Sequence, residues 1–231
     1  MTATDLVVLL PLAVLGAVLG LDVVSFPQAM ISRPIVASTL AGALIGQPGR
    51  GLVMGVALEF FALESMPFGA SRYPEWGSAS VVGGVLFAQT ANGTAGAMTV
   101  AALAALLTAS IGGSSMVLLR RANALWARKQ QARITRGSGS AVVALQLVGM
   151  TSDLLRGGVL TLLALIVFVP LHEAVTATFS ISPVVSRAVV VSIASAVGLA
   201  AVWKVVHTTV GARWYLLGGL AMGFGIAAVM K

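Results

Sequence analysis

The chain has 231 residues, of which 58% are hydrophobic and only 9% are charged. Soluble domains usually carry about 25% charged residues, so this composition excludes an ordinary soluble enzyme. It also excludes intrinsic disorder, because burial of so much apolar surface contributes more free energy than the ordering of the chain costs. The chain contains no cysteine, and its only two histidines, His172 and His207, are far apart in the sequence. We therefore expect an all-α integral membrane protein without a metal, a cofactor or a catalytic residue.

The first apolar stretches along the chain are short. A helix needs about 20 residues to cross a hydrocarbon core of about 30 Å. The stretch 6–21 ends at Asp22, the stretch 34–47 lies between two arginines, and the stretch 51–58 runs directly into Glu59. Short, proline-interrupted hydrophobic segments with isolated charges are typical of the broken or re-entrant helices of transporters, whose unwound backbone lines a substrate cavity.

The stretch 76–119 is long enough for two crossings, because it carries no charge over 44 residues, about 66 Å of helix. A turn near residues 91–93 predicts an antiparallel helix pair.

Six positive residues follow without an acid between them: Arg120, Arg121, Arg128, Lys129, Arg133 and Arg136. The positive-inside rule places such a cluster in a cytoplasmic loop. Nucleic acid is not an expected partner, because Trp126 is the only aromatic residue in this stretch and no stacking pattern is present.

These features divide the chain into a first membrane half (1–119), a basic cytoplasmic loop (120–140) and a second membrane half (141–231). Many transporters contain an inverted repeat. The segment 32–38 can be aligned with the segment 186–192, and four of the seven residues are identical. An inverted repeat and a chance match of common residues both remain open.

Two glutamates in the first half are candidate site residues, because charges within membrane segments are costly unless they are paired or face water. Glu59 and Glu64 are five residues apart, about 140° around a regular helix, so they face one cavity only if the helix breaks. Pro67 and Gly69 supply a break just beyond Glu64. This favours Glu59 as a buried ligand and Glu64 as a residue at a helix end or in a loop. The alternative for Glu64 is structural pairing with a nearby arginine, and the alternative for Glu59 is a structural role.

The run 68–77 contains both charges, two aromatic rings, proline and glycine, and we expect it to form an ordered loop. Its rings, Tyr73 and Trp76, have two interpretations. They are either anchors at the membrane interface or, beside Arg72 and Glu75, stacking surfaces of a sugar site.

Two further polar groups lie outside this loop. Asp22, Gln28 and Arg33 form a patch around a proline, which returns toward the glutamates if the segment is re-entrant. Asp153 and Arg156 are three residues apart, so they can pair on one helix, and we interpret them as a structural pair.

Several segments resemble the IIC membrane subunit of mannose-type sugar phosphotransferase systems, the mannose/fructose/sorbose family. The segment 32–42 reads Ser-Arg-Pro-Ile-Val-Ala-Ser-Thr-Leu-Ala-Gly, and it is followed by the Gly-rich segment 51–59, which ends in Leu-Glu, and by an Ala-Leu pair at 62–63. The family has an Arg-Pro ahead of Thr-Leu-x-Gly, then a Gly-rich helix with a central Leu-Glu, then Ala-Leu. The segment 146–157 resembles the family's Gln-x-x-x-Arg region. The charged loop around Arg72 and Glu75 departs from the family pattern and leaves the identity of the sugar open.

The resemblance implies a multi-pass subunit of the bacterial cytoplasmic membrane. It would bind a hexose or related sugar and expose it inward by an elevator-like movement. The implied partners are a IID membrane subunit, in a higher oligomer, and soluble IIA and IIB phosphocarriers, with IIB donating the phosphoryl group. The residues predicted to bind the sugar are Asp22, Gln28, Glu59, Glu64, Arg72 and Glu75. Two alternatives are a secondary transporter with Glu59 or Glu64 as a proton or cation site, and a non-transporting membrane scaffold or receptor.

Overall fold

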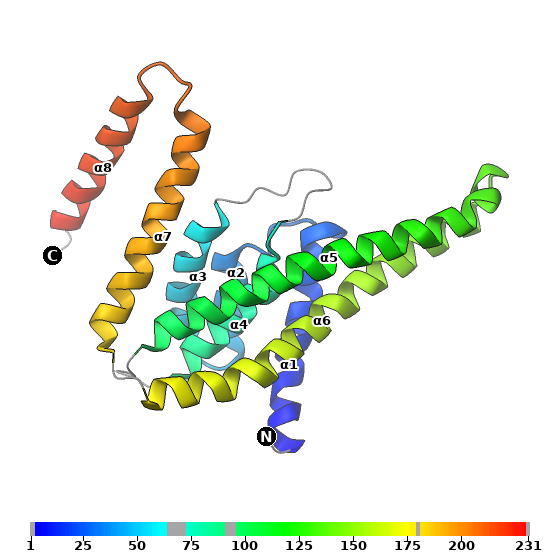
Figure 1. Ribbon diagram of the computed structural model, residues 1–231, viewed down its shortest axis with the longest axis horizontal. Helices are drawn as coiled ribbons and strands as arrows, with labels where there is room; N and C mark the ends of the chain where they lie inside the picture. Colours follow the sequence, from blue (N-terminus) through cyan, green and yellow to red (C-terminus); the bar gives the residue numbers. More distant parts are fainter. Residues whose placement is uncertain (1–2, 64–72, 91–95, 179–180, 230–231) are drawn as a thin grey trace.

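The computed structural model describes residues 3–63, 73–90, 96–178 and 181–229, and this part of the chain consists of helices joined by turns and loops, without strands (Figure 1). The prediction of an all-α membrane protein is confirmed. The helices are α1 (Ala3–Val24), α2 (Pro34–Leu44), α3 (Pro48–Ala62), α4 (Trp76–Gln89), α5 (Ala97–Thr135), α6 (Gly139–Thr178), α7 (Pro183–Val206) and α8 (Ala212–Val229).

Helices α2 and α3 form a short hairpin. Each begins with a proline at the first helical position, where the missing N–H costs nothing. Gly46 turns the chain between them with a φ of 76°, a conformation that favours glycine. The two helices have 11 and 15 residues, about 17 and 23 Å, which is less than the hydrocarbon thickness. The hairpin therefore has the dimensions of a re-entrant element, as the short apolar stretches predicted.

Helix α4 is the centre of the molecule. It is buried along nearly its whole length, and it packs against α1, α2, α3, α5 and α6. Its contact with α2 is close, since a Cβ on Gly84 would lie 2.9 Å from the Cα of Ser38. The pair of α4 and α5 matches the two segments expected within 76–119; the expected turn at 91–93 lies outside the described residues.

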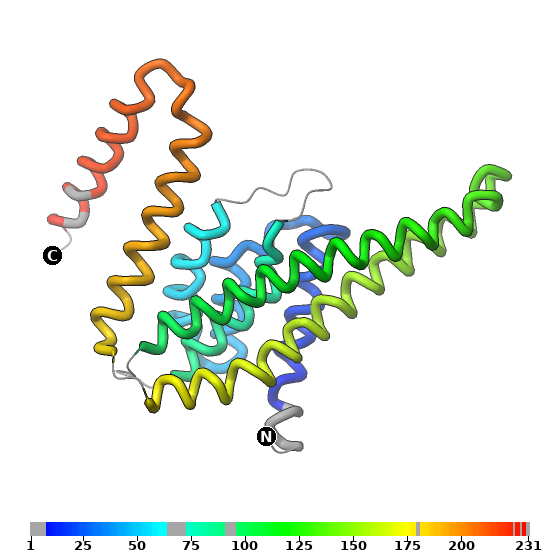
Figure 2. The backbone as a smooth tube through the Cα atoms, viewed as in Figure 1, coloured from blue at the N-terminus to red at the C-terminus, as the bar shows by residue number. Residues whose placement is uncertain are grey.

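Helices α5 and α6 are much longer than the others, with 39 and 40 residues, about 60 Å each. Both run past the body of the molecule and project side by side as a two-helix arm (Figures 1 and 2). The expectation of a loop over 120–140 is wrong in its secondary structure, because α5 continues to Thr135 and only 136–138 form the turn. The stretch is rich in alanine, arginine and glutamine, which are good helix formers, and Gly137, in the turn after the helix, has a φ of 78°.

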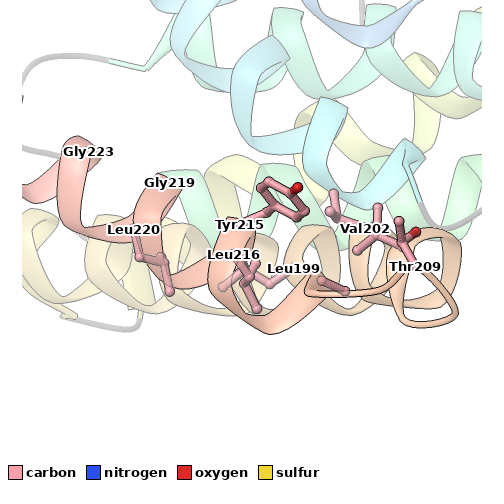
Figure 3. A pocket seen from close by; sticks show the side chains of 10 residues that line it. Leu199, Val202, Thr209, Tyr215, Leu216, Gly219, Leu220 and Gly223 are labelled. Atoms are coloured by element: carbon pink, nitrogen blue, oxygen red, sulfur yellow. The ribbon is translucent and has the colours of Figure 1, made fainter.

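Helices α7 and α8 form a hairpin at the other side of the molecule (Figure 1). Helix α7 packs against α3 and α5, whereas α8 is exposed over most of its length. An apolar groove of about 740 Å³ lies between them, with Leu199, Val202 and Leu220 among its lining residues (Figure 3).

By length and composition, α5, α6 and α7 are the described helices able to cross a membrane. The inverted repeat stays a prediction: its first copy begins α2 and its second lies within α7.

Candidate functional site

A polar cavity of about 640 Å³ lies where the ends of α1 and α2, the start of α4, and the middle of α5 and α6 meet. Its volume is in the range of small-molecule sites. Its lining combines carboxylates, guanidinium groups, amides and aromatic rings. The polar and aromatic residues that line it are Asp22, Gln28, Ser32, Arg33, Tyr73, Trp76, Arg120, Asn123 and Asp153.

Asp22 organises the loop between α1 and α2. Its side chain is only 2% exposed. Its Oδ1 accepts a hydrogen bond from the backbone N–H of Ala29 at 2.7 Å, and its Oδ2 accepts from the N–H and Oγ of Ser32 at 2.9 and 2.7 Å. Two loop residues, Gln28 and Met30, have φ values of 57° and 61°, which are uncommon outside glycine. The buried carboxylate therefore fixes a sharply turned loop at the edge of the cavity, and Gln28 is part of this loop.

Arg33 and Glu59 form an ion pair that links the two polar patches of the first half. Both the Nε and Nη2 of Arg33 donate to Oε1 of Glu59, the first at 2.7 Å. The backbone N–H of Ile35 donates to Oε2 at 3.2 Å. Arg33 lines the cavity, whereas Glu59 does not. Glu59 therefore sits behind Arg33 and holds it in place.

Asp153 reaches the cavity from the second half of the chain. Its Oδ2 accepts a hydrogen bond from Ser25 Oγ at 2.7 Å. Its Oδ1 lies 3.9 Å from Nε of Arg156, too far for a hydrogen bond. The expected pair is present, but Asp153 also lines the cavity, which the sequence analysis missed. One feature of the sequence points to a special role for Asp153, because no other acid occurs between Glu75 and Asp153.

Arg120 and Tyr73 form the aromatic wall of the cavity together with Trp76. The Nη2 of Arg120 donates to the Tyr73 hydroxyl at 2.7 Å, and the guanidinium carbon lies 5.2 Å from the ring centroid. The Nη1 of Arg120 is buried without a hydrogen-bond partner. The sequence groups Arg120 with the cations of the basic stretch and leaves two roles open for both rings. Their position places them at the cavity.

Glu75 lies outside the cavity, because it serves as the N-cap of α4. Its side chain is fully buried and accepts from the backbone N–H of Ser78 at 3.2 and 3.3 Å, which is the role of an acidic N-cap. Its own N–H donates to the carbonyl of Ala109 at 2.9 Å. The other two predicted site residues, Glu64 and Arg72, lie outside the described residues.

A second, smaller cavity of about 290 Å³ lies at the opposite end of α4 and α6, with His172, Glu173 and Gln89 among its lining residues. Nε2 of His172 lies 3.2 Å from the carbonyl of Ala97. Among the described residues, no group of three or more His, Cys, Asp or Glu side chains is placed to hold a metal ion.

The cavity of about 640 Å³ offers three kinds of contact to a ligand. Its carboxylates accept hydrogen bonds, its guanidinium and amide groups donate them, and its rings offer apolar faces. This arrangement can hold a polyhydroxylated ligand.

Comparison with known sequences identifies the family. The model of the PTS system sorbose-specific IIC component matches residues 6–231. The fructose permease IIC component of Bacillus subtilis (strain 168) is 24% identical over 163 residues, which are 71% of this chain and 59% of that protein. The chain therefore spans less than two thirds of the length of this relative.

Solved structures share the fold. A membrane-protein structure matches with a TM-score of 0.73 and 19% identity, covering 100% of this chain and 94% of the other. The mannose transporter ManYZ in complex with microcin E492 matches with a TM-score of 0.58 and 16% identity, covering 100% and 96%. Since the family model matches nearly the whole chain, this protein belongs to the family of sorbose-specific IIC components of the phosphotransferase system, as the motifs around Arg33 and Glu59 predicted.

Proposed function

We propose that this chain is the sugar-translocating IIC subunit of a mannose-type phosphotransferase system and that a hexose or related sugar binds in the cavity beside Asp22 and Asp153. The polar cavity carries the proposal, because it places acceptors, donors and aromatic rings around about 640 Å³ within an otherwise apolar protein. The fructose permease relationship supports a sugar as the substrate class.

Each part of the cavity has a role in this proposal. Asp153 accepts hydrogen bonds from sugar hydroxyls through the lone pairs that Ser25 leaves free, since an ionised carboxylate has about four acceptor positions. Arg33, Arg120 and Asn123 donate to ring or hydroxyl oxygens. Asp22 already accepts three hydrogen bonds from loop donors, so it acts mainly by shaping the wall that carries Gln28.

The location of the cavity supports release toward the side of the basic arm. Arg120 lines the cavity and is also the first cation of the basic stretch. If the basic arm is cytoplasmic, this cavity opens to the cytoplasm, where the IIB carrier phosphorylates the sugar. In this proposal the chain holds the sugar and carries no phosphoryl group itself.

The proposed assembly contains a IID membrane subunit, this chain in a higher oligomer, and soluble IIA and IIB carriers, in the bacterial cytoplasmic membrane. The solved mannose transporter with the same fold supports a multi-subunit arrangement. The alternative of a proton- or cation-coupled transporter is not favoured, because Arg33 already neutralises Glu59 and its positive charge repels a second cation.

The test is equilibrium binding of labelled mannose, fructose and sorbose to the complex purified with its membrane partner. Asp153→Asn keeps the shape of the side chain but removes charge-assisted hydrogen bonds of about 1.5–3 kcal/mol. We expect the sugar affinity to fall by roughly one to two orders of magnitude.

The matched control is Glu173→Gln, which removes one negative charge from the opposite end of the same helix, beside the smaller cavity. It should leave the affinity unchanged. Unchanged sugar binding by Asp153→Asn, or an equal loss in the control, would place the sugar site elsewhere.

A further inference from the structure

The arm formed by residues 120–148 of α5 and α6 carries a basic face that the sugar site does not use. Arg121, Arg128, Lys129 and Arg133 are all exposed. At 100° per residue they lie within an arc of about 140° on α5. The less exposed residues Asn123, Ala127, Gln130 and Ile134 lie on the opposite side of the helix, toward α6. The four cations therefore point away from the partner helix.

These cations have no carboxylate to pair with on the arm. No acid occurs between residues 76 and 152, and the two ion pairs resolved among the described residues, Arg33–Glu59 and Asp153–Arg156, both lie outside the arm tip. The charge is thus available for an anionic ligand outside the chain.

The arm and its base also expose large apolar side chains. On α6, Val142, Val143 and Leu147 are 50%, 55% and 58% exposed. Leu118 and Leu125 are 64% and 60% exposed, and they lie on the basic side of α5. Leucines interspersed with cations suit the boundary between acyl chains and headgroups, where the leucines insert and the long cationic side chains extend to the phosphates.

We propose that the α5–α6 arm lies in the membrane interface and binds anionic phospholipid headgroups through Arg121, Arg128, Lys129 and Arg133. Helix α6 is then the deeper helix, with its apolar outer side in the acyl chains, and α5 is the shallower one. A soluble acidic partner accounts for the cations but leaves the valines and leucines of α6 in water. An anionic lipid surface accounts for both features at once.

The experiment uses the full-length protein in bilayers of phosphatidylcholine and phosphatidylglycerol. Because the chain has no cysteine, Ala132→Cys accepts a single fluorophore in the middle of the basic face. Lipids with brominated acyl chains quench the fluorophore where they contact it. One Lys or Arg near an anionic surface strengthens binding about fivefold, so brominated phosphatidylglycerol should bind beside the probe at least fivefold more strongly than brominated phosphatidylcholine.

The basic face is tested with Arg128→Gln, Lys129→Gln and Arg133→Gln combined, which should lower the preference at least fivefold relative to the parent, because three of the four cations are removed and only Arg121 remains. The matched control combines Arg187→Gln, Lys204→Gln and Arg213→Gln, which removes the same charge from α7 and α8 and should retain the preference. Raising the salt to about 0.5 M in the parent should weaken it as well, since screening acts without any mutation.

Three results would overturn the proposal. Equal quenching by both lipids would show an interface without headgroup selectivity. No quenching by either lipid would place the arm in water and favour an acidic protein partner. An equal loss of preference in both triple variants would show that the preference depends on the net charge of the protein and not on the basic face of the arm.

Discussion

Glu59 provides the sharpest test of how the site works, because two roles for it predict different mutational patterns. The sequence analysis predicted direct contact with the sugar. The structure places Arg33 between Glu59 and the cavity. The informative perturbations are therefore Glu59→Gln, Arg33→Gln and the two combined.

The magnitude follows from the hydrogen bonds of the carboxylate. A glutamine oxygen can still accept from Arg33, but the amide nitrogen then faces the N–H of Ile35, and that hydrogen bond is lost. The pair is partly buried, with side-chain exposures of 32% and 22%, so solvent screens it only in part. Loss of one charge-assisted hydrogen bond and weakening of another amounts to about 1.5–3 kcal/mol. If this energy serves to hold Arg33 for the sugar, the affinity should fall by roughly one to two orders of magnitude.

The assay is sugar binding by the three variants in the assembled complex, with thermal unfolding without sugar as the check on folding. If Glu59 acts through Arg33, the double variant should bind no worse than Arg33→Gln alone, because the two effects are coupled. Losses that multiply in the double variant would mean that Glu59 contacts the sugar independently. If Glu59→Gln binds sugar like the parent and only its unfolding temperature falls, the ion pair is structural. That result would refute both direct contact with the sugar and action through Arg33.

Three further predictions concern the arm, the packing and the partner. A cysteine at Ser138, in the turn of the arm, should resist labelling by an impermeant reagent added to intact cells, because the six cations before it are hard to translocate; labelling from outside would reverse the topology. Gly20→Val should destabilise the protein by about 1–3 kcal/mol, measured by thermal unfolding, because a Cβ at this position would lie 2.9 Å from the backbone of Gly157. Gly149→Val is the control and should destabilise the protein less, because open space surrounds its Cβ. Proteoliposomes that contain this chain without a IID subunit should not accumulate sugar, and normal uptake there would show that the chain is a complete transporter.

The sequence predicted the features that depend on local composition. The length of the charge-free stretch 76–119 gave the α4–α5 pair, and the short proline-led stretches gave the α2–α3 hairpin. The basic stretch forms a helix and not the predicted loop, because its alanines, arginines and glutamines favour a helix despite the concentrated charge. Glu75, which the sequence predicts as a sugar ligand, caps α4 and does not line the cavity. Its carboxylate accepts from the N–H of Ser78, three residues onward, and an acid just before a helix is a favoured N-cap.

The residues missed at the site are those brought in by long-range packing. Proximity in the sequence predicts only the pairing of Asp153 with Arg156, and nothing local relates Asp153 to Ser25, its closest partner. The sequence likewise groups Arg120 with the other basic residues, although its guanidinium donates to the hydroxyl of Tyr73.

The crossing of α1 and α6 explains how distant residues meet at the cavity. Gly16 packs against Thr161, and Gly20 packs against Gly157. The two helices are antiparallel, so a step of one turn forward along α1 matches a step of one turn back along α6. The next contact in this series joins Ser25, just after the end of α1, to Asp153. Small residues four apart on both helices permit this close approach, as in membrane helix pairs generally. The glycine spacing in α1 therefore sets the register that delivers a carboxylate from the second half of the chain to a loop held by Asp22 in the first.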